Sequence, residues 1–378
     1  MRNLNYHERP ILAFWETTRS CLLSCAHCRA EAMADPLPGE LSTDEGKAFI
    51  HSLTEFGKPY PVLILTGGDV LMRKDAMELV AYARSLDLPV AMSPSVTPNL
   101  TVERMQAMKS HGVRMVSISL DGAKAETHEA IRGVPNHFEQ TLQAMRQLVE
   151  LGFHIQVNTA IMRDNVHELP AIAEILKDIG VATWEVFFLV HVGRGQNSRE
   201  LNPVECEDVS HFLYDASAYD LTVRTVEGPF FRRIVKWRER DGLNTHVDPE
   251  RVATTYHLGP LYKTLAGELI ERLGSTDAAP KAQTSQTRDG KGIVFVSYDG
   301  TVYPAGFLPL PLGSIRNTSL ATIYRENPVL RQIRNAEFTG HCGDCDMKDL
   351  CGGSRARAYA HSGDPLAEDP ACAYRFKG

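Results

Sequence analysis

Three cysteines directly follow a short apolar segment in the stretch Ile11-Leu-Ala-Phe-Trp-Glu-Thr-Thr-Arg-Ser-Cys21-Leu-Leu-Ser-Cys25-Ala-His-Cys28. The segment Ile11–Thr17 predicts a β-strand, and the cysteines then lie on the loop after it. Three thiolates can ligate three irons of a 4Fe–4S cluster and leave the fourth iron without a protein ligand. Catalysis at a metal requires such an open position. We therefore expect a catalytic cluster held by Cys21, Cys25 and Cys28.

A zinc loop is the alternative interpretation of these cysteines. A structural zinc site takes four protein ligands. The nearest further donor is His27, which lies inside the loop between two of the cysteines. Ligand number and the position after a strand therefore favour a cluster.

Apolar segments alternate with stretches of helical periodicity from residue 11 to residue 191. The further expected strands are Val62–Thr66, Val90–Ser93, Met115–Leu120, His154–Thr159 and Trp184–Val190. The expected helices are Thr43–Phe56, Ala76–Ser85, Glu103–His111, Phe138–Leu151 and Leu169–Ile179. This alternation predicts an α/β fold with parallel strands and right-handed crossovers. Six such units form a partial TIM-like (β/α)6 barrel, whose functional residues lie at the C-terminal ends of the strands.

The alternation ends near Gly195, and two further regions follow. Residues 196–290 are mixed, with a helix expected at Leu258–Leu273 and a loop over Gly274–Gly290. The tight-turn signal Asp-Gly at 299–300 predicts a β-hairpin from Gly292–Tyr298 and Thr301–Pro304. We therefore predict a barrel over residues 1–195, a bridging region over 196–290 and a small α+β domain over 291–378.

Composition and charge exclude several classes of protein. The chain has 378 residues and a formal net charge of -7, which argues against a nucleic-acid partner. No stretch approaches the roughly 18 apolar residues of a membrane helix. Residues 1–10 are polar and charged, unlike a secretory signal. We expect a cytoplasmic protein without a membrane partner, and a monomer.

A second group of cysteines lies near the C-terminus. Four thiolates can close a zinc site or fully ligate a 4Fe–4S cluster, and the spacing alone leaves both open. The remaining cysteine, Cys206, stands in the polar run Val204–Asp208, and we expect it to have no metal role. The four cysteines of the group are Cys342, Cys345, Cys351 and Cys372.

The first cysteine motif resembles the signature of the radical S-adenosylmethionine (SAM) superfamily, CxxxCxxC with an aromatic residue, here His27, before the last cysteine. The second expected strand ends in a sequence similar to the family's GGE motif, with Asp69 and Val70 in place of glutamate and proline. The fourth ends in Ser119-Leu-Asp121-Gly, which resembles the family's SxDG segment near the ribose. The resemblance implies SAM contacts from Thr66, Gly67, Gly68, Asp69, Ser119 and Asp121.

The resemblance also implies a reaction. A radical SAM enzyme cleaves SAM reductively to a 5′-deoxyadenosyl radical, which abstracts hydrogen from the substrate. The electron would come from a reductase such as flavodoxin or ferredoxin. The class is that of an oxidoreductase or lyase, and the catalytic acid or base residues stay unassigned.

The C-terminal cysteines resemble those of SPASM and twitch extensions, which carry auxiliary Fe–S clusters. Full SPASM domains bind two clusters, but here Ala305 and Ser354 stand where relatives often have cysteine. We therefore expect one auxiliary 4Fe–4S cluster, ligated by all four tail thiolates. Because such a cluster has no open iron, it would relay electrons or stabilise the domain.

Several further segments look similar to the radical SAM enzymes of alternative heme and heme d1 biosynthesis. This resemblance implies oxidative decarboxylation or modification of tetrapyrrole propionates. Carboxylate-binding candidates are Arg194, Arg232 and Arg233, although ordinary surface arginines are the alternative. Arg355 and Arg357 are expected to anchor the tail cysteine loop. The segments are Trp15–Cys21, His27–Ala30, Leu65–Asp69, Arg132–Val134, Gln156–Thr159, Phe188–Val190, Gly193–Gly195 and Cys351–Ala358.

Other functions stay open at this point. His128 and His191 are candidate heme ligands, but a single histidine is more often a surface or core residue. Maturation of a ribosomal peptide is the alternative enzyme function, and the residues before Cys21 are too few for a peptide-recognition domain. A non-enzyme alternative is an Fe–S electron carrier or a zinc-binding protein.

Overall fold

Ten strands form one sheet in the order β10-β9-β8-β1-β2-β3-β4-β5-β6-β7. The computed structural model describes residues 5–243, 248–284 and 287–374, so residues 285–286 of the predicted loop lie outside the described part. The strands are β1 (Leu12–Glu16), β2 (Val62–Thr66), β3 (Val90–Met92), β4 (Met115–Ser119), β5 (His154–Ile161), β6 (Thr183–Phe188), β7 (Thr222–Val226), β8 (Ile293–Val296), β9 (Thr301–Tyr303) and β10 (Gly313–Ser314).

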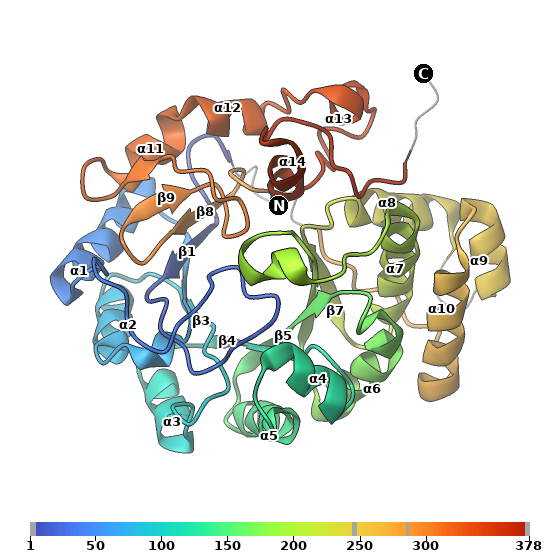
Figure 1. Cartoon of the computed structure of the whole chain (residues 1–378), viewed down its shortest axis with the longest axis horizontal. Coiled ribbons are helices and arrows are strands. Elements are labelled where there is room, and N and C mark those ends of the chain that lie inside the picture. The colour runs from blue at the N-terminus through green and yellow to red at the C-terminus, as the bar shows by residue number, and fades with distance from the viewer. Residues whose placement is uncertain (1–4, 244–247, 285–286, 375–378) are drawn as a thin grey trace.

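The strands from β8 through β1 to β7 are all parallel, and the sheet curves into a partial barrel with helices outside it (Figure 1). All six strands predicted for the barrel are present, so the predicted fold class is confirmed. The covering helices are α1 (Thr43–Ser52), α2 (Ala76–Ser85), α3 (Val102–Ser110), α4 (Ala125–Arg132), α5 (His137–Glu150) and α6 (Leu169–Ile179). Single turns of 3-10 helix add η1 (Leu53–Phe56), η2 (Val70–Met72), η3 (Val166–Glu168) and η4 (Gly193–Asn197).

The region over residues 196–290 contains more regular structure than the sequence suggests. Strand β7 pairs in parallel with β6 and extends the barrel by one strand. It was missed because Thr222-Val-Arg-Thr-Val226 is short and mixes polar with apolar residues. The expected helix at Leu258–Leu273 is present as α10. The helices of this region are α7 (Pro203–Ala216), α8 (Phe231–Asp241), α9 (Pro249–Tyr256) and α10 (Pro260–Leu273).

The C-terminal region joins the same sheet. The predicted hairpin is confirmed as β8 and β9, which pair antiparallel, and the other edge of β8 pairs in parallel with β1. Figure 1 shows α14 between the two ends of the sheet, with β8 and β9 on one side and β7 on the other. The division of the chain at residues 195 and 290 stays a prediction. The helices of the tail are α11 (Leu320–Glu326), α12 (Pro328–Arg334), α13 (Gly340–Asp344) and α14 (Arg355–Ser362).

Alternation of side chains along each strand separates the core from the inside of the barrel. In β5 the buried residues alternate with partly exposed ones, and Ile155 and Val157 face the helices. The partly exposed Gln156 and Asn158 face inward and are joined by a hydrogen bond of 2.8 Å. The outer face forms the hydrophobic core, and the inner face is left for polar and functional groups.

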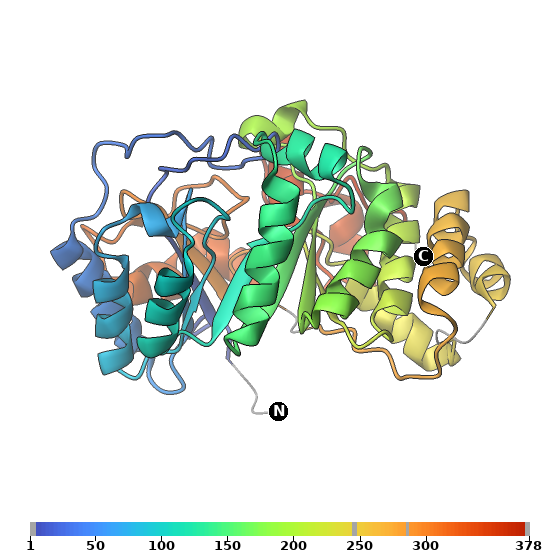
Figure 2. The ribbon, with the colours of Figure 1, turned by 90° about the horizontal axis from the view of Figure 1, so that it is seen from below.

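The loops after the strands gather at one end of the barrel (Figure 2). Figure 2 shows the loop after β1, the helix α4 and the turn η4 on the same side of the sheet. Because parallel strands share one C-terminal edge, these segments can contact one another although they are far apart in sequence.

None of the helices in the described residues combines the length and the apolar character that crossing a bilayer requires.

We predict opposite effects of alanine at two helical glycines. A Cβ atom at Gly46 would lie 2.6 Å from Cη2 of Trp15, whereas Gly267 has no neighbour within 4 Å. Gly46→Ala should lower the free energy of unfolding by about 1–3 kcal/mol through overpacking. Gly267→Ala should raise it by up to about 1 kcal/mol because alanine favours helix. Chemical denaturation measures both, and a loss at Gly267 with no loss at Gly46 would contradict this packing.

Candidate active site

The three N-terminal cysteines lie together on the segment after β1, residues 17–33, which we name the cysteine loop. The main-chain N–H of Cys21 donates to the carbonyl of Met33, which closes the loop at 2.7 Å. Cys21 and Cys25 are buried and Cys28 is partly exposed, and all three pack in one cluster with Leu23. The structure therefore brings the three predicted thiols to one place.

Each of these sulfur atoms accepts a hydrogen bond from an N–H group. The donors are the main chain of Leu23 to Cys21 Sγ (3.4 Å), the main chain of Ala32 to Cys28 Sγ (3.5 Å) and the guanidinium of Arg132 to Cys25 Sγ (3.6 Å). Burial raises the pKa of the Cys21 thiol, whereas the N–H of Leu23 and the Ser95 hydroxyl favour the thiolate. Metal ligation deprotonates a thiol outright and so overcomes the burial cost.

The thiols are not arranged around a single ion. Over the described ranges, no three His, Cys, Asp or Glu side chains are grouped closely enough to hold one metal ion. A mononuclear zinc site needs its sulfurs about 2.3 Å from one point. A cluster instead takes each thiolate on a separate iron. The three thiols brought together in the cysteine loop match the number of thiolates that hold a cluster with one open iron.

The glycine motif after β2 packs against the cysteine loop. The N–H groups of Gly68 and Asp69 donate to the carbonyls of Thr18 and Ser20, both at 2.7 Å. A Cβ at Gly67 would lie 2.6 Å from the Thr18 carbonyl oxygen, and one at Gly68 would lie 2.4 Å from that of Ser20. Only glycine therefore allows this close approach of two main chains.

The carboxylate of Asp69 is turned into the protein. It is fully buried, accepts from Thr97 Oγ1 at 2.8 Å and caps η2 through the N–H of Leu71. Burial raises its pKa, although these donors oppose the shift. The Asp69 carboxylate is thus engaged with protein groups. The carbonyl oxygen of Thr66 also has a protein partner, because it accepts from the N–H of Thr17.

The C-terminal end of α4 holds the cysteine loop from a second side. The Ala26 N–H donates to the carbonyl of Ile131, and the Ser24 hydroxyl donates to that of Gly133. Arg132 joins the loop to the end of β4, because it contacts Cys25 Sγ and forms an ion pair of 2.6 Å with Asp121.

The turn η4 holds the loop from a third side. The Arg194 guanidinium donates to the carbonyls of Cys25 (2.9 Å) and Ala32 (3.1 Å). The main-chain N–H of Arg194 donates to the Cys28 carbonyl. A Cβ at Gly193, whose φ is 54°, would lie 2.4 Å from the Arg29 carbonyl oxygen. Three segments picked out by resemblance, Leu65–Asp69, Arg132–Val134 and Gly193–Gly195, thus all clamp the cysteine loop.

Asp121 lies at the centre of a buried charged network. Its side chain accepts from the Ala160 N–H at 2.8 Å, and His27 Nε2 lies 3.6 Å away. Burial pushes the pKa of Asp121 upward, but the charge of Arg132 and the other neighbours hold it below its usual range. Ser119 ends β4 and is partly exposed. Both predicted residues therefore lie at the C-terminal edge, and Asp121 is engaged with protein groups.

Unsatisfied polar atoms gather around the cysteine loop. Within the described part of the chain, four buried nitrogen atoms near this loop have no hydrogen-bond partner, whereas Glu16 Oε1 and Asp121 Oδ2 are held by ion pairs with Arg29 and Arg132. Native proteins leave few such atoms, so this concentration indicates a site for a polar ligand. The atoms are Arg19 Nε, His27 Nδ1, Arg132 Nε and Arg194 Nη2.

The arginines proposed as carboxylate ligands have other partners. Arg194 holds the cysteine loop, as described above. Arg233 is buried in a bidentate ion pair with Glu207 at 2.6 and 2.8 Å, so it is not a surface residue. Arg232 donates to the main-chain carbonyls of Leu350 and Thr287. The interpretation of these three as substrate ligands at the barrel mouth is therefore not supported.

The histidines proposed as heme ligands are also engaged. His128 is fully buried, stacks on His137 at 5.0 Å and accepts from the Asp121 N–H at 3.1 Å. Burial lowers its pKa to about 3. His191 contacts the carbonyl of Ser198 at 3.2 Å. His128 is thus the core residue that the alternative interpretation expected.

The four tail cysteines line one pocket between α8, α13 and the C-terminal segment. The pocket is small, with a cavity volume of about 20 Å³. Two consecutive left-handed glycines, Gly352 (φ 75°) and Gly353 (φ 63°), turn the chain after Cys351. A Cβ at Gly353 would lie 3.1 Å from Cys342 Sγ. The pocket contains Cys342, Cys345, Cys351 and Cys372.

Arginines surround this pocket. The guanidinium of Arg355 donates to Cys342 Sγ at 3.7 Å, and the positive charges of Arg232 and Arg233 act on Cys351. Burial, together with the charge of Arg232, lowers the pKa of Arg288 to about 10. Buried cations that repel one another indicate an anionic centre among them. Thiolates that ligate a cluster would supply this charge.

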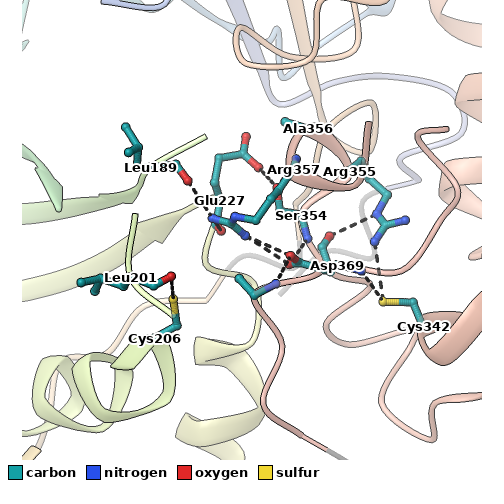
Figure 3. Close-up of polar contacts among 12 residues, drawn as sticks. Leu189, Leu201, Cys206, Glu227, Cys342, Ser354, Arg355, Ala356, Arg357 and Asp369 are labelled. Carbon is teal, nitrogen blue, oxygen red and sulfur yellow. Dashed lines mark hydrogen bonds and ion pairs between the residues drawn. The ribbon is translucent and has the colours of Figure 1, made fainter. Parts of the chain in front are cut away.

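Arg357 ties the tail to the barrel (Figure 3). It pairs with Asp369 at 3.1 Å and donates to the carbonyls of Leu189 and Glu227 at the ends of β6 and β7. Two positions where relatives often have cysteine differ in their contacts. Ser354 caps α14 and also donates to Glu227, whereas the side chain of Ala305 is buried. Position 354 therefore has a hydrogen-bonding role. The expectation that Arg355 and Arg357 anchor the tail agrees with these contacts.

Cys206 lies in α7 and is not among the residues that line the pocket of the tail cysteines. It is 3% exposed, and burial raises its pKa to about 12. Its sequence neighbours are polar, but the helix turns its own side chain into the core. Figure 3 shows its sulfur directed at the carbonyl of Leu201.

The family comparison agrees with this geometry. Residues 15–201 match the model of the radical SAM superfamily, and residues 288–346 match that of an iron-sulfur cluster-binding domain. The chain is 39% identical over 368 residues to the AdoMet-dependent heme synthase of Nitratidesulfovibrio vulgaris, covering 96% of this chain and 92% of that protein. It is 28% identical to the mycofactocin maturase MftC of Mycobacterium tuberculosis, covering 97% and 83%.

A solved structure shares the fold. The complex of Streptococcus suis SuiB with S-adenosylmethionine aligns with a TM-score of 0.68 at 11% identity, covering 97% of this chain and 78% of that one. Radical SAM enzymes use a 4Fe–4S cluster together with SAM, and the three thiols that pack together in the cysteine loop lie within the matched residues. By its sequence and its fold, the chain belongs to the radical SAM superfamily.

Proposed function

We propose that the protein removes carboxyl groups oxidatively from the propionate side chains of a tetrapyrrole. The observation that carries this proposal is 39% identity to a heme synthase over 96% of the chain. The reaction removes one hydrogen atom, CO2 and one electron from a –CH2–CH2–COO⁻ group and leaves a vinyl group. It therefore needs a hydrogen-abstracting centre and an electron acceptor.

The cysteine loop is proposed as the first of these sites. A 4Fe–4S cluster on Cys21, Cys25 and Cys28 would supply an electron to SAM at its open iron. The residues around it hold the loop rigid, because the Gly67-Gly68 main chain, Arg132 and Arg194 contact it from three sides. For SAM we assign the main chain of Thr66, Gly67, Gly68 and Asp69, with Ser119 and Asp121 at the neighbouring strand end.

The tail pocket is proposed as the second site. One auxiliary 4Fe–4S cluster on Cys342, Cys345, Cys351 and Cys372 would supply a one-electron acceptor without an open iron. The arginines around the pocket stabilise negative charge there. A flavodoxin-like or ferredoxin-like reductase as electron donor and a monomeric state belong to this proposal.

A peptide substrate is the second candidate. It is favoured by 28% identity to the mycofactocin maturase. The heme synthase has the higher identity at nearly the same coverage, so we place the tetrapyrrole first.

We predict separate loss of the two clusters. Anaerobically reconstituted protein should contain about eight irons per chain. Cys25→Ala and Cys345→Ala should each lower this by about four, because each removes one ligand of a different cluster. Cys206→Ala, the matched control, should retain the full content. Iron and sulfide analysis measures the result. An unchanged iron content in Cys345→Ala would contradict the second cluster.

We predict turnover of iron coproporphyrin III. With SAM and dithionite, the reconstituted enzyme should form vinyl products together with 5′-deoxyadenosine. Compared as neutral acids, each product should be lighter than its precursor by CO2 and two hydrogen atoms for every propionate converted. Mass spectrometry of the porphyrin identifies the change. The Cys25→Ala variant should form neither product. Formation of 5′-deoxyadenosine with an unaltered porphyrin would argue for another substrate, such as a peptide.

A further inference from the structure

Most arginines at the cysteine end of the barrel are committed to structural contacts. Arg73 forms a bidentate ion pair with Asp75 and donates to two main-chain carbonyls. Arg132 pairs with Asp121, and Arg357 pairs with Asp369. Arg194 donates to two carbonyls of the cysteine loop. Arg132 Nε and Arg194 Nη2 have no hydrogen-bond partner, but both atoms are buried.

Arg19 and Arg29 differ, because they share one carboxylate. Arg29 Nη1 lies 3.1 Å from Glu16 Oε1, whereas Arg19 Nε lies 4.0 Å from Glu16 Oε2, beyond hydrogen-bond distance. The side chain of Arg29 is 19% exposed and that of Arg19 is 30% exposed, whereas Glu16 is buried at the end of β1. Arg19 Nε is also one of the buried atoms without a hydrogen-bond partner. Two guanidinium groups facing one carboxylate leave one positive charge uncompensated.

An aromatic surface continues from Arg29 along the inside of the barrel. The guanidinium of Arg29 lies over the ring of Phe295, 4.5 Å from its centroid, and Phe295 contacts Tyr303 with centroids 6.3 Å apart. Across the barrel, Phe187 of β6 contacts Phe307 at 5.9 Å. Phe295 is only 4% exposed and lies beneath Arg29. We name the three partly exposed side chains, Phe187, Tyr303 and Phe307, the aromatic wall.

Gly306 joins the two halves of the wall. A Cβ atom at this position would lie 3.2 Å from Arg29 Nε and 3.3 Å from the Phe295 ring, so the loop carrying Phe307 lies against both. Register places Phe295 opposite Phe14, on the same inner face as Glu16. Phe187 lies on the inner face of β6, since Trp184, Val186 and Phe188 are buried on the other face. Arginine, carboxylate and aromatic groups therefore share one surface inside the barrel.

We infer that Arg29, assisted by Arg19, binds a carboxylate of the substrate, and that the aromatic wall packs against its planar conjugated ring. Arginine's planar fork suits a carboxylate, and aromatic side chains stack on a conjugated ring. Glu16 then orients Arg29 and partly balances its charge while the substrate is absent. This inference rests on the proposed function and identifies the site at which the tetrapyrrole binds.

The position of Arg29 suits this role. It directly follows Cys28, so a carboxylate held there lies at the cysteine end of the barrel. A propionate bound in this way would present its methylene groups on the same side as the proposed SAM site. The sequence candidates Arg194, Arg232 and Arg233 are held by the cysteine loop, by main-chain carbonyls and by Glu207, respectively. The partly exposed pair Arg19 and Arg29 is therefore assigned instead.

The test compares an acid with its ester. Reconstituted protein is titrated with coproporphyrin III and with its tetramethyl ester, and porphyrin fluorescence gives each dissociation constant. In the natural protein we expect the acid to bind at least about tenfold more tightly, which is the size of one charge-assisted contact. Arg29→Met should abolish this preference and Arg29→Lys should restore part of it. Arg19→Met should reduce it, and the remote Arg240→Met serves as the control.

The ratio of the two dissociation constants distinguishes loss of a carboxylate contact from misfolding, because misfolding weakens the binding of acid and ester alike. The assignment would be overturned if the natural protein, Arg29→Met and Arg19→Met all showed the same preference for the acid over the ester. The proposed function would then stay intact. If the natural protein binds no porphyrin, the proposed function itself fails, and this inference fails with it. If Arg29→Met does not fold, the Arg19→Met and Arg29→Lys ratios decide.

Discussion

The close contact between two main chains, residues 17–20 after β1 and residues 66–69 after β2, is the constraint on which the active end of the barrel depends. The N–H groups of Gly68 and Asp69 continue the hydrogen bonding of the two strands beyond their ends. No side chain fits between the chains, because a single Cβ at Gly68 would lie 2.4 Å from a carbonyl oxygen. This contact directs the cysteine loop across the barrel mouth, where the end of α4 and the turn η4 then hold its other sides. The thiols are thus positioned by backbone geometry before any metal contributes.

Electrostatics distinguishes the two cysteine sites. Around the cysteine loop, charged and polar atoms lack partners, as expected where a cluster, SAM and a substrate all meet. Around the tail pocket, buried arginines face four thiols, and Arg288 and Arg232 destabilise each other's charge. The first site is consequently suited to exchange ligands, and the second to hold a permanently bound anionic centre. Arg357 connects the tail to the ends of β6 and β7, so the second site is attached rigidly to the barrel.

The sequence predicted those features that depend on local pattern. Strong apolar alternation predicted six strands, and spacing predicted both cysteine groups, because thiol ligands close together in the chain need little help from the fold. It missed β7, whose polar residues Thr222 and Arg224 hide the strand pattern. It predicted SAM contacts from residues 66–69, but it could not show that the carboxylate of Asp69 turns inward onto Thr97. It also chose Arg194 and Arg233 over Arg29, since only three-dimensional contacts show which arginine already has a partner.

The central claim is that the cysteine loop holds a cluster with one iron open to SAM. Electron paramagnetic resonance of the reduced Cys345→Ser variant tests this most directly, because that variant should contain only the first cluster. Adding SAM should shift the g values of the reduced cluster, since the amino and carboxylate groups of SAM ligate the open iron. A fully formed cluster whose spectrum does not change with SAM would contradict the account.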